Sequence, residues 1–505
     1  MLVQQFLEQS ADRTPGKLAL VCDGQRLTYA QVEERSNRLA NALKASGVQR
    51  GERVLIYLPN CVELVVSIFA VLKAGGVFVV VHHTTKHDKL AYILRNCQAS
   101  ALIASEAHTE LARQLIQEVS SLKTIVIIPA ANAAGMLSYQ AIQQESSPQR
   151  PARINIDLDL ACLIYTSGST GEPKGVMSDH SNVDFATDSI ISYLKNTADD
   201  IVIDVLPLSF DYGLYQLLMV FKFGGTLVLE KGFAFPATIL KRIEEERVTG
   251  FPGVPTIFAV LLQMDLCPYN LSSLRYLTNT AAALPPSHIT QLRNKFPWVA
   301  LYSMYGLTET KRTLYLPPDQ LDARPGSVGI AIPGTEVWLE DEQGKRLGAN
   351  QVGELVVRGR HVMRGYWGDA VATAERFRPG ALPGERLCYT GDLFRMDDAG
   401  YFYFVARKDD IIKSRGEKVS PKEVEAVLYE LPGVAEAAVI GVPDPVLGEA
   451  VKAFVVVSDG AGLTPADVIK HCRAKLEDLM VPKYIEFCRE LPKTASGKIT
   501  KVGLK

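Results

Sequence analysis

A run of small, hydroxylated and basic residues is the stretch of this sequence best suited to chemistry. Residues 165–176 read YTSGSTGEPKGV and follow the apolar run Leu160 to Ile164. This order predicts a strand leading into an anion-binding loop, because glycines let backbone N–H groups approach an anion and hydroxyl groups add donors. The phosphate-binding residues expected here are Thr166, Ser167, Gly168, Ser169, Thr170 and Gly171, with the positive charge of Lys174 beside them.

Two better-known glycine-rich loops do not fit these residues. In a Walker loop a Gly-Lys-Ser/Thr triplet begins five positions after the first glycine, whereas Pro173 stands five positions after Gly168. A serine-hydrolase elbow has glycine two positions before its serine, and Ser167 occupies that position before Ser169. An ordinary surface turn has a similar composition, so the stretch by itself leaves that alternative open.

The composition indicates a multidomain globular protein without a general affinity for polyanions. With 505 residues the chain exceeds what one hydrophobic core usually serves. Its 54 basic and 56 acidic residues nearly cancel, which argues against nucleic acid or an anionic membrane as a partner. Eight scattered cysteines predict a reducing, cytoplasmic location. We see neither a leader-like start nor an apolar run of about 18 residues that would cross a membrane.

The elements that would position the loop alternate between strand and helix. A hairpin around Asp23-Gly24 and a helix are expected first, followed by repeated strand, helix, strand units, which predict a parallel sheet. The polar segment 129–153 lacks periodicity and predicts a surface connector. The two clearest units comprise the segments 54–58, 62–74 and 77–81, and the segments 201–206, 217–221 and 226–229.

The glycine-rich stretch and several later motifs resemble the adenylate-forming superfamily, which contains acyl-CoA synthetases, luciferases and peptide-synthetase adenylation domains. LKAGGVFV at 72–79, MYGLTET at 304–310, YTGD at 389–392 and KTASGK at 493–498 occur in the order that the superfamily shows. The resemblance covers residues 10–500 and implies ATP-dependent conversion of a carboxylic acid into an acyl-adenylate, with ATP and Mg²⁺ as cofactors. A thiol would accept the acyl group in a second step.

The resemblance also implies a multidomain α/β fold. A large N-terminal domain, residues 1–408, would contain parallel-rich sheets flanked by helices plus a small barrel. A small mobile α+β domain, residues 409–505, would follow, with Asp409 at the hinge. In the superfamily a glycine precedes the arginine that matches Arg407, and Ala406 stands there in this chain.

The superfamily motifs imply roles on the nucleotide side of the site. Tyr305 would lie beside the adenine, Thr308 would reach the α-phosphate, and Glu309 would hold Mg²⁺. Asp392 would accept both ribose hydroxyls, and Arg407 would contact the ribose and phosphate.

Two further residues match positions with a catalytic role in the superfamily. Lys498 would bridge the acid and the α-phosphate, although a disordered basic tail is the alternative so near the C-terminus. His180 follows the glycine-rich stretch at the spacing of the superfamily, and an exposed histidine near a helix cap is the alternative there.

The acid-binding side depends most on Asp211, in the segment SFDYGLYQ. A carboxylate among aromatic residues is costly unless it is paired. Amino-acid-activating relatives place an aspartate at this position to bind the substrate's α-ammonium, and a helix N-cap is the alternative. Alanines in place of glycines at 281–283 would narrow the pocket. The substrate-binding residues expected are Asp211, Tyr212, Tyr215, Ala281, Ala282 and Met304.

These observations favour a free-standing ligase that activates a small amino acid, with proline as the best candidate. Because we find no carrier segment in the chain, the acceptor would be a phosphopantetheine arm of a separate carrier protein. One alternative is an acyl-CoA synthetase for a fatty or aryl acid, which DIIKSRGEKVSPKEVEAVL at 410–428 favours. The other alternative is a non-catalytic nucleotide-binding module.

Overall fold

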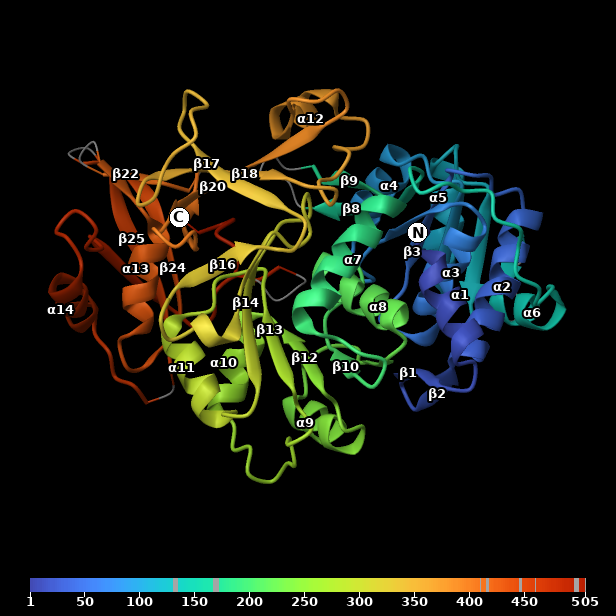
Figure 1. The fold of residues 1–505 in the computed structure, drawn as a ribbon, viewed down its shortest axis with the longest axis horizontal. Coiled ribbons are helices and arrows are strands. Elements are labelled where there is room, and N and C mark those ends of the chain that lie inside the picture. The colour runs from blue at the N-terminus through green and yellow to red at the C-terminus, as the bar shows by residue number, and fades with distance from the viewer. Residues whose placement is uncertain are drawn as a thin grey trace.

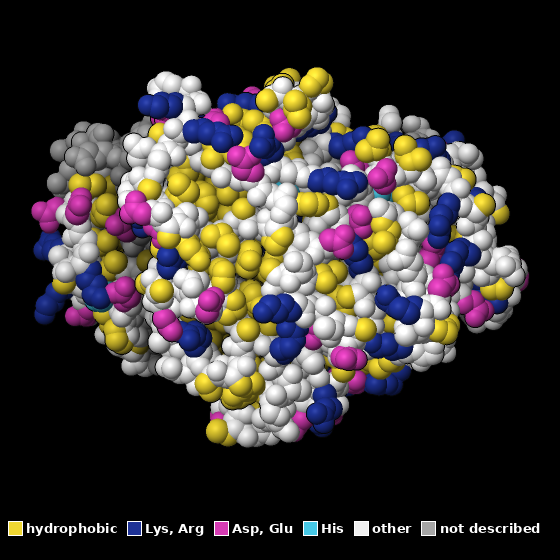
Figure 2. Space-filling view, in the orientation of Figure 1, with side chains coloured by type: hydrophobic (Ala, Val, Ile, Leu, Met, Phe, Trp, Pro, Cys, Tyr) yellow, Lys and Arg dark blue, Asp and Glu magenta, His cyan; other side chains and the backbone are white. Residues whose placement is uncertain are grey.

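The protein is described by a computed structural model at residues 1–129, 135–166, 172–408, 410–414, 417–444, 447–458, 460–494 and 499–504. These residues form three sheets with helices packed against them (Figure 1). On the face shown in Figure 2, basic and acidic side chains are interspersed, as the near-zero net charge predicts. Within the described ranges no helix is both long and apolar enough to span a membrane.

The first sheet confirms the predicted parallel arrangement. Its seven strands are ordered β7-β6-β5-β3-β4-β8-β9, and the pairs β3–β4, β3–β5 and β5–β6 are parallel. The strands are β3 (Arg53–Tyr57), β4 (Val77–Val80), β5 (Ala101–Ser105), β6 (Thr124–Ile128), β7 (Leu137–Ser138), β8 (Leu160–Thr166) and β9 (Lys174–Asp179), and the connecting helices are α3 (Val62–Lys73), α4 (His87–Asn96) and α5 (Thr109–Glu118).

The segment predicted as a surface connector contains secondary structure that the sequence pattern did not indicate. Strand β7 joins the edge of the first sheet, and helix α6 (Tyr139–Glu145) follows it. Ser138 caps the helix, because its side chain accepts a hydrogen bond from the N–H of Ala141, and the helix buries Tyr139 and Ile142. The sequence did not reveal this helix because only two of its seven residues carry the apolar contact.

The second sheet has a part with parallel strand pairs and a part with antiparallel strand pairs. Its main path is β17-β18-β20-β21-β16-β15-β14-β13-β12-β10-β11-β1-β2. The pairs from β1 with β11 through β13 with β14 are parallel, and those from β14 to β17 are antiparallel. The region predicted as a small barrel is the antiparallel part of this sheet. The predicted hairpin is β1 (Leu18–Cys22) with β2 (Gln25–Thr28), turning at Asp23 and Gly24 with φ of 50° and 77°.

The remaining elements of this sheet flank or continue it. Its other strands are β10 (Ile201–Asp204), β11 (Thr226–Leu229), β12 (Gly250–Gly253), β13 (Tyr276–Asn279), β14 (Ala300–Tyr305), β15 (Leu314–Leu316), β16 (Ser327–Ala331), β17 (Glu336–Glu340), β18 (Val352–Arg358), β19 (Phe377–Pro379), β20 (Arg386–Met396) and β21 (Phe402–Arg407). The helices around it are α1 (Gln4–Arg13), α2 (Tyr29–Ala45), α9 (Pro236–Glu245), α10 (Pro255–Gln263), α11 (Pro286–Lys295) and α12 (Ala370–Arg376).

Two helices lie between the sheets and carry the centre of the core. They are α7 (His180–Leu194) and α8 (Asp211–Phe223), and both appear in the middle of Figure 1. Eleven of the residues of α8 are buried, from Asp211 to Phe221, so this helix has almost no exposed face. A helix that is apolar around most of its circumference must be covered on all sides. The polar residues at its start are therefore inside the protein.

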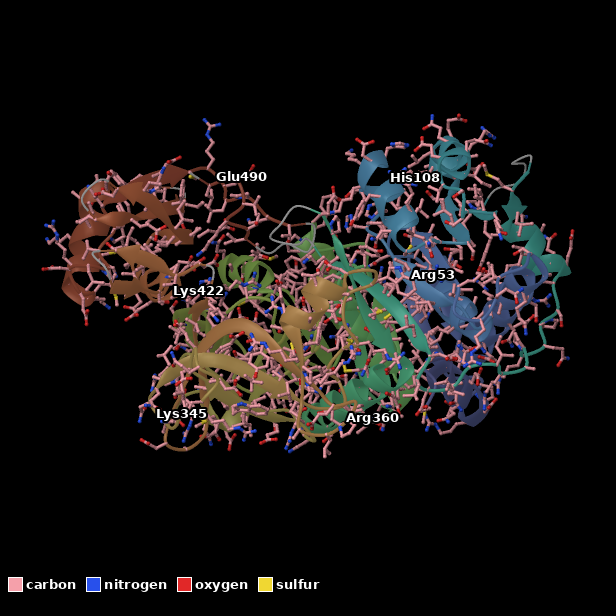
Figure 3. All side chains as sticks on the ribbon, turned by 90° about the horizontal axis from the view of Figure 1, so that it is seen from above. Arg53, His108, Lys345, Arg360, Lys422 and Glu490 are labelled. Carbon is pink, nitrogen blue, oxygen red and sulfur yellow. The ribbon has the colours of Figure 1, made fainter. Side chains whose placement is uncertain are left out.

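The third sheet forms the small C-terminal domain. Its path is β23-β22-β25-β24, with β26 paired to β25. It lies at the end of the molecule opposite the first sheet: Lys422 and Glu490 are on its side in Figure 3, and Arg53 and His108 are on the other. Asp409, the predicted hinge, lies outside the described residues. The elements are β22 (Ile412–Ser414), β23 (Glu417–Val419), α13 (Pro421–Tyr429), β24 (Val434–Asp444), β25 (Gly448–Val457), α14 (Pro465–Lys475) and β26 (Tyr484–Cys488).

Candidate active site

The predicted phosphate loop joins two antiparallel strands. Strand β8 ends at Thr166, and β9 begins at Lys174, directly opposite Thr166 in the ladder. Both ends of the loop are therefore fixed by the first sheet. Of the residues predicted to bind phosphate, Thr166 and Lys174 are described. Ser167, Gly168, Ser169, Thr170 and Gly171 lie outside the described residues.

Lys174 lies near two groups from the segment after β18. Its Nζ is 3.6 Å from Oδ2 of Asp369 and 5.4 Å from the centre of the Tyr366 ring. A cation over an aromatic face is attracted by the ring electrons. These contacts place the positive charge of Lys174 beside Tyr366.

A tight loop between β14 and β15 carries Thr308 and Glu309. The N–H of Thr313 donates to the carbonyl of Tyr305 over 2.9 Å, which closes the loop. A side chain at Gly306 would place its Cβ 1.9 Å from the carbonyl oxygen of Lys311, so only glycine fits there. Thr308 and Glu309 are half-buried, whereas the residues from Thr310 to Thr313 are buried. The loop therefore presents its first half toward solvent and its second half toward the core.

The Glu309 carboxylate is held by a tyrosine. The hydroxyl of Tyr366 donates to Oε1 of Glu309 over 2.6 Å. Burial raises the pKa of Tyr366, and the charge of Glu309 raises it further. The phenol therefore stays protonated and remains a donor. Through Tyr366 the loop lysine, Lys174, and the predicted metal ligand, Glu309, are joined in one cluster.

The three residues predicted to contact adenosine also come together. The hydroxyl of Tyr305 donates to Oδ2 of Asp392 over 2.6 Å, and Nε of Arg407 is 3.7 Å from Oδ1. Burial raises the pKa of Tyr305 well above its usual value, and the neighbouring Asp392 adds to the shift. The ladder between β20 and β21 continues through Ala406, so alanine is accommodated where the superfamily has glycine.

Asp211 has a partner inside the protein, contrary to the expectation that a substrate ammonium would pair with it. Its Oδ1 is 3.0 Å from Nζ of Lys311, and its Oδ2 is 3.7 Å from Nη1 of Arg312. The three residues are 5, 0 and 3 % exposed, respectively. The N-cap alternative also fails, because Phe210 is the cap and Asp211 is the first helical residue. The ammonium next to Asp211 belongs to Lys311.

The two tyrosines of α8 surround this cluster. Tyr212 hydrogen-bonds the carbonyl of Thr278 over 2.8 Å, and the Arg312 guanidinium lies 4.4 Å from the centre of its ring. Tyr215 is fully buried, with Nζ of Lys311 5.6 Å from its ring centre. Their role as walls of an acid pocket stays a prediction.

The remaining predicted pocket residues lie on, or shortly after, neighbouring strands of the second sheet. Met304 is buried in β14, and its sulfur accepts a hydrogen bond from the Tyr193 hydroxyl over 2.9 Å. Ala281 and Ala282 are half-buried after β13. Ala281 has a φ of 73°, a conformation that glycine adopts freely and that strains alanine. The chain thus keeps a glycine-like turn here with a methyl group added.

His180 occupies a core position rather than the exposed one that the alternative interpretation required. It is 0 % exposed at the start of α7, and its Nδ1 accepts a hydrogen bond from the N–H of Val3 over 3.0 Å. Burial lowers its pKa to about 4. The observed contact links α7 to the N-terminal helix, and a catalytic role of His180 stays a prediction.

Sequence reasoning missed Lys311, Arg312 and Tyr366. The two basic residues directly follow MYGLTET, and Tyr366 lies in a segment interpreted as structural turns. Basic residues next to a predicted anion site were a usable signal, but their pairing with Asp211 joins positions a hundred residues apart. Lys498, the predicted catalytic lysine, lies outside the described residues.

Comparison with known proteins shows that this chain belongs to the AMP-binding enzyme family. Residues 7–367 match that family, and residues 423–498 match the C-terminal domain of AMP-binding enzymes. The chain is an AMP-forming acid–thiol ligase, an enzyme class that converts an acid into an acyl-adenylate at the expense of ATP.

Two curated relatives and one solved structure illustrate the similarity. A long-chain-fatty-acid–CoA ligase of Bacillus subtilis is 33 % identical over 98 % of this chain and 93 % of its own length. A feruloyl-CoA synthase of Amycolatopsis is 36 % identical, covering 97 % and 96 %. The crystal structure of the anthranilate CoA ligase AuaEII with anthranoyl-AMP superposes with a TM-score of 0.92 at 30 % identity, covering 99 % and 95 %.

Proposed function

We propose that this protein is an acyl-CoA synthetase that activates an acid without an α-ammonium group. Its relatives include ligases named for fatty and aryl acids with coenzyme A as acceptor. The observation that carries the proposal is the buried pair between Asp211 and Lys311. A carboxylate already neutralised by a lysine offers a substrate ammonium little attraction, and a second ammonium beside Lys311 would be repelled.

The first step forms the acyl-adenylate. A carboxylate oxygen of the acid attacks the α-phosphorus of ATP, the new O–P bond forms, and the bond to pyrophosphate breaks. Negative charge accumulates on the phosphates in this step, so fixed donors and cations lower its barrier. Lys174 and Thr166 at the ends of the loop, together with Thr308, would surround the phosphates. Asp392, Arg407 and Tyr305 would hold the adenosine.

The residues present fit a magnesium ion. Glu309 offers a half-buried carboxylate near Lys174, and Tyr366 fixes its orientation through Oε1. Mg²⁺ is commonly bound through one or two protein carboxylates together with substrate phosphates. When bound on Glu309, the ion would neutralise charge on the phosphate oxygens.

The second step transfers the acyl group to a thiol. The thiolate attacks the acyl carbon, the C–O bond to AMP breaks, and a thioester remains. Lys498 would serve the first step and Asp409 would act as the hinge for a rotation between the steps. The division into residues 1–408 and 409–505 supports such a rotation, because the strands of the second sheet end at Arg407 and those of the third begin at Ile412.

Acid-dependent pyrophosphate release across fatty, aryl and amino acids tests this proposal, with coenzyme A or a phosphopantetheinylated carrier protein as acceptor. We expect the fastest release with an acid that lacks an ammonium group, and we expect mass spectrometry to find the acyl-CoA. Faster activation of proline than of every other acid, with product only on the carrier, would refute the proposal. If none of the acids in the panel caused pyrophosphate release, the proposal would also be refuted.

A further inference from the structure

The cluster around Asp211 carries an uncompensated positive charge. Lys311 and Arg312 are cations, and Asp211 is the one carboxylate in ion-pair distance of both among the described residues. Two other carboxyl groups lie in the surroundings. Burial raises the pKa of Asp204 well above its usual value, which favours its neutral form. Asp179 faces Arg364, with Oδ2 3.3 Å from Nε, so its charge is already matched.

The same cluster has hydrogen-bond donors without acceptors. Nε and Nη2 of Arg312 and the hydroxyl of Tyr215 are buried and have no hydrogen-bond partner among the described residues. Nζ of Lys311 likewise makes no hydrogen bond there, although it is ion-paired with Asp211. Buried polar groups are almost always hydrogen-bonded, and a charged group without an acceptor is especially costly. The buried Oδ1 of Asp211 also lacks a hydrogen bond, but it faces Nζ of Lys311 at 3.0 Å. The remaining donors, those of Arg312 and Tyr215, point to an anionic ligand.

The donors lie close to where the acid must react. Lys311 and Arg312 belong to the loop that also carries Thr308 and Glu309, and the hydrogen bond from Thr313 to Tyr305 holds the loop closed. Arg312 stacks on Tyr212, which fixes the guanidinium plane. A guanidinium held in this way presents two N–H groups in a fork that matches a carboxylate. Helix α8 supplies Tyr215, whose ring centre is 5.6 Å from Nζ of Lys311.

We propose that Arg312, with Tyr215 and Lys311, binds a second anionic group of the acid substrate. The preferred substrate class is then a dicarboxylic acid, of which one carboxylate reacts and the other is held by Arg312. This inference rests on the proposed acyl-CoA synthetase function and narrows its substrate. A purely structural Arg312 would be satisfied by protein acceptors, and the described residues supply only the 3.7 Å contact with Asp211.

Matched acids test the inference. Each dicarboxylic acid from succinate to suberate, and each phthalate isomer, is compared with its own monomethyl ester, which keeps one reacting carboxylate and loses the second charge. We expect the best diacid to exceed its ester about 10- to 100-fold in kcat/KM for pyrophosphate release, as charged hydrogen bonds provide. Substituting Arg312→Met should reduce this ratio to about one, because kcat/KM should fall more with the diacid than with its ester.

A second arginine provides the control. Arg346 lies over the ring of Trp338 at 3.9 Å, as Arg312 lies over Tyr212, but in the antiparallel region. Arg346→Met should leave the diacid-to-ester ratio unchanged. Should Arg312→Met fail to fold, Arg312→Lys keeps the charge without the fork and should lower the ratio only in part.

The outcomes distinguish failure of the diacid inference from failure of the proposed synthetase function. A wild-type enzyme that makes acyl-CoA from monocarboxylic acids at least as well as from diacids would overturn the inference and leave the synthetase function standing. Equal losses with diacid and ester in Arg312→Met would also overturn it, because Arg312 would then serve the reacting carboxylate or the fold. No acyl-CoA from any acid would instead remove the proposed function.

Discussion

The nucleotide side and the acid side of the site differ in how their polar groups are satisfied. On the nucleotide side, Tyr305 is hydrogen-bonded to Asp392 and Tyr366 to Glu309. On the acid side, Arg312 and Tyr215 are more deeply buried and retain donors without acceptors among the described residues. The groups of the first set are paired with one another, and those of the second retain buried donors without an acceptor among the described residues.

This difference separates what the family shares from what distinguishes its members. A nucleotide is the same for every member, so its contacts can be carried by short motifs on neighbouring strands. An acid differs between members, and discrimination between acids requires buried groups that the wrong acid leaves unpaired. We therefore expect substitutions on the nucleotide side to affect all acids equally, and substitutions on the acid side to change their order.

The largest expected effect concerns stability on the acid side. Asp211→Ala removes the partner of the buried Lys311 and should lower the free energy of unfolding by about 3 to 5 kcal/mol. The double variant Asp211→Ala, Lys311→Met should recover part of this loss, because the lysine charge is removed with its partner and only the Arg312 cation remains without a carboxylate. Urea denaturation of both variants measures the coupling. Additive losses would show that the pair does not interact as the 3.0 Å distance implies.

A loss of similar size is expected for the first half-reaction in Lys498→Ala. Removing one preorganised charge-stabilising donor typically costs about 3 to 4 kcal/mol, a rate factor of about 100 to 1,000. Adenylate formation should fall by this factor with every acid, whereas thioester formation from a supplied acyl-adenylate should not change. Stopped-flow measurement of the two half-reactions decides the matter. Equal loss in both would contradict a domain rotation between them.

A buried histidine that belongs to neither the nucleotide side nor the acid side of the site predicts how stability depends on pH. Because the pKa of His180 is lowered to about 4, the unfolded chain binds its proton first as the pH falls below the ordinary value of 6.5. The contribution of His180 to the free energy of unfolding should therefore be constant above about pH 7. This contribution should fall by about 3 kcal/mol between pH 6.5 and 4. His180→Asn keeps an acceptor for the N–H of Val3 and should flatten this part of the curve. An unchanged slope in chemical denaturation would argue against the assignment.

The smallest expected effect concerns Asp392 and tests directly whether the nucleotide side differs from the acid side. Asp392→Asn keeps the side-chain size and removes the charge predicted to accept the ribose hydroxyls. Hydrogen bonds to charged groups contribute about 1.5 to 3 kcal/mol, so the KM for ATP should rise about 10- to 100-fold. The order of preference among acids should stay as in the wild type, in contrast to Arg312→Met. Steady-state kinetics with three acids would expose a change in that order.

The sequence determined the fold class and the nucleotide side. The alternation of strands and helices predicted the parallel sheets, because hydrophobic periodicity in the sequence reflects which residues are buried. Tyr305 and Asp392 were predicted from motifs on different strands, and the structure brings them within hydrogen-bond distance. Helix α6 was missed, because few of its residues are buried and its stability comes from packing against α2 rather than from its own pattern.

Only the tertiary structure decided the acid side. The sequence indicated that Asp211 required a positively charged partner, and the family resemblance supplied a substrate ammonium. The structure supplies Lys311 instead, from a loop that returns to the start of α8. Burial of a charge can be inferred from its apolar neighbours, but the partner is selected by through-space distance. That distance depends on how β13, β14 and α8 pack, and no local pattern in the sequence encodes it.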